Sequence, residues 1–262
     1  GGRPVKWVGT NVAESLPIYG AGPSAQALGV NGDGSVIVGW SGFGYPYDQV
    51  AVRWVNGQVE SLGIPPGFVR TWATGVSANG SVIVGVAEAP GLVSQAFVWT
   101  QGTGITLLPN NASPYTTVTS VSADGRVIAG RSGADSVVWK DGVLYRVQAE
   151  LIPAGTVIAP FTSLAGGARV SRDGTTIASA EVVREAPGDG EYHAWVVVLP
   201  EWFTGPGACA ADFTADGAVD GDDVIGFFGA WDAGELAADF NGDGGVDGDD
   251  VIAFFGAWDS GC

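Results

Sequence analysis

The feature of this chain that most restricts its fold is an internal repeat in its first 200 residues. Four turn dipeptides that end in Gly follow one another at spacings of 46, 45 and 49 residues: Asp33-Gly34, Asn79-Gly80, Asp124-Gly125 and Asp173-Gly174. Each dipeptide lies between two runs of strand-forming residues, a pattern typical of β-hairpins. The chain is therefore expected to fold by repeating one supersecondary unit.

Each unit continues to a second strand-like run that contains Trp. Trp54, Trp99 and Trp139 stand at equivalent positions, and Trp195 stands two residues earlier in its unit. Because alternate residues of a strand share a face, this offset keeps Trp195 on the same face as the others. A repeated unit of four short strands with one Trp is typical of a propeller blade. We therefore expect residues 1–200 to form a mostly β, propeller-like domain of about four to five four-stranded blades.

The N-terminal segment, residues 4–16, matches the second half of a repeat. Its sequence PVKWVGTNVAESL aligns with AVRWVNGQVESL, so that Trp7 corresponds to Trp54. The four units that follow each have their own Trp-bearing strand, and no unpartnered first half is evident. Open strand edges recruit other strands. We therefore expect this segment to form an irregular edge blade or to pair with another subunit, with Trp7 in the inward position of the other Trp residues.

The repeats over residues 5–199 resemble the extracellular HAF-repeat family, which is named for a His-Ala-Phe triplet. The closest variants of that triplet here are Gln95-Ala96-Phe97 and His193-Ala194-Trp195. The resemblance implies an extracellular β-propeller and brings no activity with it.

Catalytic residues are sparse in the repeats. His193 is the only His of the chain, and the other units have unrelated residues at its position, so we interpret it as structural. We find no Ser-His-Asp or Cys-His arrangement that the sequence would support. The remaining option is a paired-carboxylate catalytic site formed by Glu181, Glu185, Asp189 and Glu191. A solvated loop between strands is the simpler interpretation of these residues. We therefore predict that the protein is not an enzyme.

Two near-identical twelve-residue segments near the C-terminus have the pattern of calcium loops. Residues 212–223 read DFTADGAVDGDD and residues 239–250 read DFNGDGGVDGDD, with side-chain oxygens at positions 1, 3, 5, 9 and 12 and Gly at position 6. Ca2+ takes six to eight oxygen ligands, and one such loop supplies nearly all of them. The predicted ligands of two Ca2+ ions are Asp212, Thr214, Asp216, the Ala218 carbonyl, Asp220 and Asp223 for the first, and Asp239, Asn241, Asp243, the Gly245 carbonyl, Asp247 and Asp250 for the second.

Each loop runs into the same short helical pattern. An acidic disordered tail is the alternative, but it does not account for the register that the two segments share after their loops. The apolar residues at i, i+1, i+3, i+4 and i+7 are Val224, Ile225, Phe227, Phe228 and Trp231 in the first segment and Val251, Ile252, Phe254, Phe255 and Trp258 in the second. This spacing predicts one apolar helix face. Because a helix this short is marginal alone, we expect the two faces to pack on each other.

This tandem unit, residues 209–262, resembles a type I dockerin, the small calcium module that docks on a cohesin of a scaffold protein. It shares Asp at loop position 12 and the lack of a full entering helix. The resemblance implies a small α, EF-hand-like, calcium-binding domain. At loop positions 10 and 11, where dockerins often carry a hydroxyl pair for cohesin recognition, the chain has Gly221-Asp222 and Gly248-Asp249, which does not favour a cohesin partner.

The two cysteines and the charge indicate the compartment. Cys209 and Cys262 bracket the calcium module, and we predict a disulfide between them, worth about 4 kcal/mol in the chain-entropy model, with two free thiols as the alternative. A disulfide implies an oxidising, extracytoplasmic location. The net charge of −17 argues against nucleic acid as a partner. No apolar run reaches the length of a membrane span. We therefore expect an extracellular protein, secreted or at the cell surface.

The sequence thus predicts a β-repeat domain over residues 1–200, a linker over 201–208 and a calcium domain over 209–262. Three functions remain possible: a non-catalytic structural protein that joins copies of itself, as a homo-oligomer or filament, or joins a cell-surface matrix; a glycan- or protein-binding propeller displayed on a scaffold protein; and an enzyme. We favour the first, because the half repeat requires a partner and loop positions 10 and 11 do not fit a cohesin.

Overall fold

The computed structural model describes residues 2–8, 12–42, 49–152, 167–183, 191–200, 203, 211, 213–214, 219–235, 238–240 and 245–260. The side chains of residues 8, 12, 180–183, 191–193 and 259–260 are outside this description. The chain divides into two compact units, Gly1–Leu199 and Pro200–Cys262. Of the predicted linker, residues 201–208, only Phe203 is described.

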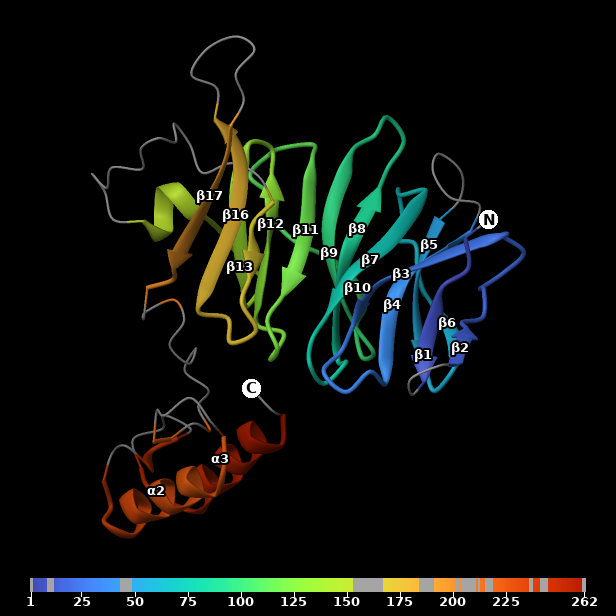
Figure 1. Ribbon diagram of the computed structural model, residues 1–262. Coiled ribbons are helices and arrows are strands. Elements are labelled where there is room, and N and C mark those ends of the chain that lie inside the picture. Colours follow the sequence, from blue (N-terminus) through green and yellow to red (C-terminus); the bar gives the residue numbers. More distant parts are fainter. Residues whose placement is uncertain are drawn as a thin grey trace. The chain divides into compact units, whose positions relative to one another are not determined.

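The first unit consists of antiparallel sheets built from strands that are consecutive in the chain (Figure 1). The first four-stranded sheet contains β3 (Ser24–Val30), β4 (Val36–Gly42), β5 (Gln49–Val55) and β6 (Gln58–Gly63). The second contains β7 (Arg70–Val76), β8 (Val82–Glu88), β9 (Ser94–Thr100) and β10 (Gly104–Leu107). The third contains β11 (Thr116–Val121), β12 (Val127–Ser132), β13 (Asp135–Lys140) and β14 (Val143–Arg146), which leads into a π-helical turn, η1 (Val147–Leu151).

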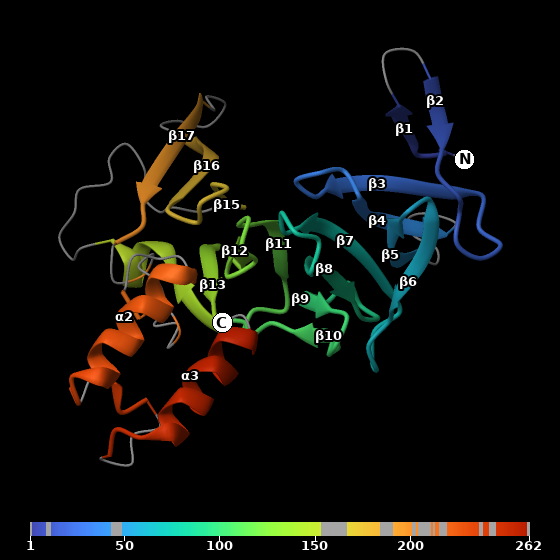
Figure 2. The same ribbon diagram turned by 90° about the horizontal axis from the view of Figure 1, so that it is seen from below.

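Two smaller sheets lie at the ends of this series. The hairpin β1 (Val5–Val8) and β2 (Val12–Ser15) precedes the first four-stranded sheet, and β15 (Arg169–Val170), β16 (Thr176–Val183) and β17 (Glu191–Val198) form a three-stranded sheet after the third. Neighbouring sheets follow one another in chain order (Figure 2). The prediction of a mostly β, propeller-like fold made of four-stranded units is confirmed for three units. The fourth unit has three described strands, so its predicted fourth strand is not among the described residues.

A series of backbone hydrogen bonds connects the first turns of successive units. Gly32 N–H donates to the Ala78 carbonyl at 3.0 Å, Ala78 N–H to the Ala123 carbonyl at 2.8 Å, and Ala123 N–H to the Arg172 carbonyl at 2.7 Å. All four residues occupy the same place, directly before the Asp-Gly or Asn-Gly dipeptide of each repeat. The Gly of each dipeptide has a positive φ, which explains why Gly stands there: Gly34, Gly80, Gly125 and Gly174. Each turn thereby fixes the register of the next unit.

Side-chain packing between successive units centres on the repeated Trp. A Leu at or directly after the end of the last strand of one unit packs in the same cluster as the Trp of the next unit. These pairs are Leu16 with Trp54, Leu62 with Trp99, and Leu108 with Trp139. Burying one Trp in this way removes a large apolar area from water, so the Trp is the main apolar contact of each junction.

The Trp side chains also satisfy their polar atom at these junctions. The Trp54 indole N–H donates to the Pro17 carbonyl at 2.8 Å, and the Trp139 indole N–H donates to the Pro109 carbonyl at 2.7 Å. In both cases the acceptor follows the packing Leu of the preceding unit. These two junctions therefore combine an apolar contact with one directed hydrogen bond, which fixes the orientation of the ring.

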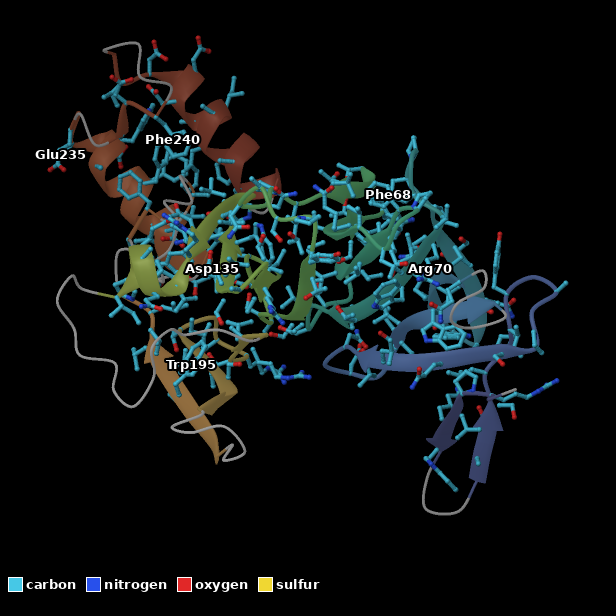
Figure 3. The ribbon with its side chains drawn as sticks, turned by 90° about the horizontal axis from the view of Figure 1, so that it is seen from above. Phe68, Arg70, Asp135, Trp195, Glu235 and Phe240 are labelled. Carbon is cyan, nitrogen blue, oxygen red and sulfur yellow. The ribbon has the colours of Figure 1, made fainter. Side chains whose placement is uncertain are left out.

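Trp195 confirms the register predicted for the fourth unit. On β17 it lies opposite Ser179, as Phe97 on β9 lies opposite Gly85. Its side chain is buried, on the sheet β15–β17 (Figure 3). The two-residue offset thus leaves the aromatic ring on the inward face. Val197 takes the position that Trp99 has in the second four-stranded sheet.

The second compact unit, Pro200–Cys262, contains two helices that pack through their Phe residues. The helices are α2 (Gly221–Asp232) and α3 (Gly248–Ser260). The rings of Phe227 and Phe254 stack with centroids 4.3 Å apart, and both side chains are fully buried. The predicted packing of two helix faces is therefore observed. Neither helix, nor any other helix in the described ranges, is long and apolar enough to cross a membrane.

One part of the predicted helix face is wrong. Ile225 and Ile252 are 72% and 71% exposed, so neither belongs to the packed face. Successive residues of a helix are about 100° apart, which places Ile225 about 200° from Phe227. The stacked Phe pair therefore defines the buried side, and the Ile two positions earlier faces away from it.

The junction contacts predict unequal effects for Trp substitutions. Trp139→Ala is expected to lower the free energy of unfolding of the first unit by about 3–5 kcal/mol, because it empties a fully enclosed site. Trp7→Ala is expected to change it by less than about 0.5 kcal/mol in dilute solution, because Trp7 is mostly exposed. Denaturant unfolding of the full chain measures both values. Equal losses for the two variants would contradict this account of the junctions.

Candidate functional site

Three of the predicted ligand positions of the first calcium loop are described, positions 3, 9 and 12, which are Thr214, Asp220 and Asp223. Asp223 is buried, and its carboxylate accepts hydrogen bonds from the loop. The Thr214 N–H and hydroxyl both donate to Asp223 Oδ1 at 2.9 Å. The Asp220 N–H donates to Asp223 Oδ2, also at 2.9 Å. The position-12 carboxylate thus holds both ends of the described loop against the start of α2.

The same contacts cap the helix. Asp220 is the N-cap of α2, and its side chain accepts a hydrogen bond from the Asp222 N–H. The Asp223 N–H also donates to the Asp220 side chain, and together with the bond from the Asp220 N–H to the Asp223 carboxylate this forms a reciprocal capping box. Acidic groups at this end are also favoured by the helix dipole. Loop and helix therefore share their key side chains, which explains why they recur as one unit.

The hydrogen bonds set the ionisation of Asp223. Burial by itself raises the pKa of this carboxyl group, because it disfavours the charged form. The N–H groups of Thr214 and Asp220 and the Thr214 hydroxyl act in the opposite direction and together place the pKa below its ordinary value. Asp223 is therefore a carboxylate at neutral pH, the form in which it can accept these hydrogen bonds or coordinate a cation.

The second loop repeats this geometry. Asp250 is fully buried at position 12 and accepts the Phe240 N–H on Oδ1 and the Asp247 N–H on Oδ2, both at 2.8 Å. The Asp247 side chain accepts the Asp249 N–H at 2.9 Å, as Asp220 does in the first loop. The Oδ1 atom of Asp239, at position 1, is buried as well. Figure 3 shows Phe240 beside the helices, where its ring packs edge-on against Phe254.

The remaining predicted ligands lie outside the described residues. These are Asp212, Asp216, Ala218, Asn241 and Asp243, and the same holds for Cys209 and Cys262. Within the described part of the chain, no group of three or more His, Cys, Asp or Glu side chains could hold a metal ion. The two complete ligand sets and the disulfide therefore stay predictions. The described residues fit a cation in one respect: each loop holds a buried Asp side chain at its position 12.

The N-terminal half repeat has the detailed structure of the outer half of a unit. β1 and β2 pair so that Trp7 lies opposite Ala13, as Trp54 lies opposite Val59 in the first four-stranded sheet. The preceding Lys6 forms an ion pair with Glu14 at 3.1 Å, and the corresponding residues of β5 and β6 are also a basic–acidic ion pair. The assignment of residues 4–16 as a closing half is therefore consistent with the strand register.

The predicted burial of Trp7 is not found within the chain. Its side chain is 70% exposed, whereas Trp54 is 1% exposed. The difference has a simple cause, because no preceding unit among the described residues covers the face of β1 that carries Trp7. The exposed face of β17 at the other end of the unit was not anticipated from the sequence. There Val196 and Val198 are 65% and 74% exposed.

A cleft that the sequence did not predict lies beside the half repeat. Its volume is about 420 Å³, and its lining includes Arg3, Val5, Gln26 and Trp40. The Trp40 indole N–H donates to Gln26 Oε1 at 3.1 Å. No sequence motif predicts this cleft. It forms where the residues before β1 lie along β3, with the Ala25 N–H donating to the Gly2 carbonyl.

The possible catalytic groups of the fourth unit lie beyond the described side chains. The backbone of His193 pairs with that of Glu181 across β17 and β16, and neither side chain is described. Glu185 and Asp189 are outside the described residues, and the side chain of Glu191 is not described. The predicted absence of a catalytic set remains a prediction.

Comparisons with known proteins identify no family and add little to what the strand pairing shows about the fold. No protein-family model and no curated protein matches the chain. Similar solved structures include TolB from Acinetobacter baumannii (15% identity, TM-score 0.46, 67% of this chain and 41% of that chain). Others are an oligogalacturonate lyase in complex with manganese (16%, 0.42, 64% and 46%) and hydrazine synthase from Kuenenia stuttgartiensis (12%, 0.39, 68% and 52%).

The chain thus spans from 41% to 52% of the length of these structures. With TM-scores below 0.5, the similarities carry no inference about activity. The architecture of the first unit therefore rests on its own sheet topology.

Asp223→Asn is expected to destabilise the second unit by about 1–3 kcal/mol in calcium-free buffer, because the amide nitrogen cannot accept one of the backbone N–H groups. Helical circular dichroism during denaturation in the presence of a chelator measures the effect. Asp222→Asn is the matched control, since Asp222 is exposed and adjacent in sequence. A loss as large for the control as for Asp223→Asn would contradict the role given to the buried carboxylate.

Proposed function

We propose that this chain is a secreted, non-catalytic structural protein, stabilised by calcium, that joins copies of itself or a cell-surface matrix. The observation that supports this most is the exposed Trp7 on a half repeat. In the other junctions of the first unit, the corresponding Trp is covered by a neighbouring unit. A repeat protein that leaves such a face open exposes a surface suited to assembly.

Calcium binding belongs to the same proposal. The loops resemble those of a type I dockerin, and the residues that would hold two Ca2+ are the two predicted ligand sets. The ions would supply the positive charge that offsets mutual repulsion of the loop carboxylates, so binding and folding of the second unit would be coupled. The described residues support this through Asp223 and Asp250, each of which is buried and fixed by backbone N–H groups.

An extracellular location and a disulfide between Cys209 and Cys262 complete the proposal. A disulfide that closes the ends of the second unit would restrict its unfolded state, while the metals would stabilise its folded state. Both contributions would suit a small domain outside the cell, where thiols oxidise and calcium is plentiful.

A glycan- or protein-binding function, displayed through the dockerin-like unit on a scaffold protein, is the second candidate. The cleft beside β1 favours it, because Trp40 offers an aromatic surface and Gln26 a hydrogen-bonding amide in one depression. Sites for small ligands combine apolar surface with a few polar groups in this way. Binding of a glycan array that is lost in Trp40→Ala would favour this candidate over self-assembly.

Two measurements on the full chain test the main proposal. Sedimentation velocity is expected to show species larger than a monomer in calcium and smaller species after chelation. Calorimetry is expected to find two Ca2+ per chain. Asp239→Ala is expected to abolish one of the two binding events, because it removes a charged ligand, whereas Asn241→Ala is expected to weaken it less, because it removes a neutral one.

The outcomes separate the parts of the proposal. Fewer than one ion per chain would refute the calcium sites. A monomer at every concentration, with and without calcium, would refute self-association and leave attachment to a matrix to be tested by binding to isolated cell envelopes.

A further inference from the structure

Each junction between repeats of the first domain joins the same two surfaces. In each case the residue directly before the Trp of one repeat contacts the Trp-bearing side of the next repeat. The Arg53 guanidinium lies 4.6 Å from the ring centre of Trp99, a cation–π contact. Val98 packs against the cluster that contains Trp139. One surface of each junction is therefore the Trp side of a unit, and the other is the third strand of the unit before it.

Both surfaces are left open in the same chain, one at each end of the first unit. At the start, the Trp side is exposed on β1, where Trp7 lies, and on β3, where Val30 is 59% exposed although its counterparts Val76 and Val121 are packed. At the end, Val196 on β17 takes the position of Val98 and Val138. Val138 is fully buried, whereas Val196 is largely exposed.

We propose that these two ends bind each other between copies of this chain, so that the β17 face with Val196 and Val198 of one copy covers Trp7 of the next. The contact would reproduce the junction that the chain already forms between its own units. Its chemistry is therefore specified by the repeat itself. This inference rests on the proposed self-association and assigns it a site.

A second copy is the occupant that the structure favours. β1 and β17 lie at opposite sides of the first unit in two perpendicular views (Figures 1 and 2). Each face is exposed within one chain, so neither covers the other. A contact between unlike faces leaves one free face of each kind at the ends of every complex, and such head-to-tail contacts build rings or open chains.

Two variants of the full chain test the contact, each of which removes one face. Trp7→Ala is expected to leave the β17 face intact, and Val196→Asp to leave the Trp7 face intact. Each variant alone is expected to associate at least about thirtyfold more weakly than the unaltered chain, as loss of a central aromatic contact or burial of a charge would cause. Val143→Asp is the matched control, since Val143 is also exposed on a strand of the same unit.

Mixing the two variants gives the decisive result. One intact Trp7 face and one intact β17 face remain in the mixture, so a one-to-one dimer without larger species is expected in light scattering. Melting curves of each variant alone confirm that it is folded. Association of Trp7→Ala or Val196→Asp as strong as that of the unaltered chain would overturn this contact while leaving self-association in place. A monomeric unaltered chain would overturn both, and quenching of Trp7 in that monomer would show that the two faces close on each other within one chain.

Discussion

The contact between the Trp of one unit and the Leu that precedes it in the chain is the interaction on which the first domain depends. Each pair joins residues of different units, so no single unit can bury its own Trp. Leu16 and Trp54 show this most simply, because a two-stranded half repeat is enough to enclose the ring of the next unit. The backbone bonds between successive turns then fix the spacing. Stability is consequently distributed over junctions, as in other repeat proteins.

The second compact unit, Pro200–Cys262, likewise buries its aromatic residues between two copies of one element, which here is a loop followed by a helix. The loops bring Phe213 and Phe240 edge-on to the stacked pair Phe227 and Phe254, so loop and helix contribute to one apolar cluster. The buried Asp at the end of each loop is directly next to this cluster in sequence. Closing the loop and seating the helix are therefore one event, and a cation that ordered the loop would stabilise the aromatic packing as well.

Much of this arrangement could be predicted, because it depends on local patterns. Turn dipeptides located the hairpins, and the two-residue offset of Trp195 placed its ring on the correct face. The sequence-based predictions failed or were incomplete where the environment of a residue depends on neighbours that are distant in the chain. Ile225 belongs to an apolar run, yet the helix turns it away from the Phe pair. Asp223 was predicted to be a calcium ligand from its loop position, but its bonds to Thr214 and Asp220 are visible only once the loop is closed.

The sequence by itself determined the spacing of the repeats, the turns that begin them, the half repeat at the N-terminus and the two acidic loops, because each is a spacing along the chain. Only the tertiary structure decided which faces are covered. Trp7 and Trp54 stand in closely similar local sequences, VKWV and VRWV, and one is exposed while the other is buried. The physical reason is that burial is a property of the neighbour, and a repeat motif carries no information about whether a neighbour is present. The same reason accounts for Val138 and Val196, which share a register position and differ in what lies over them.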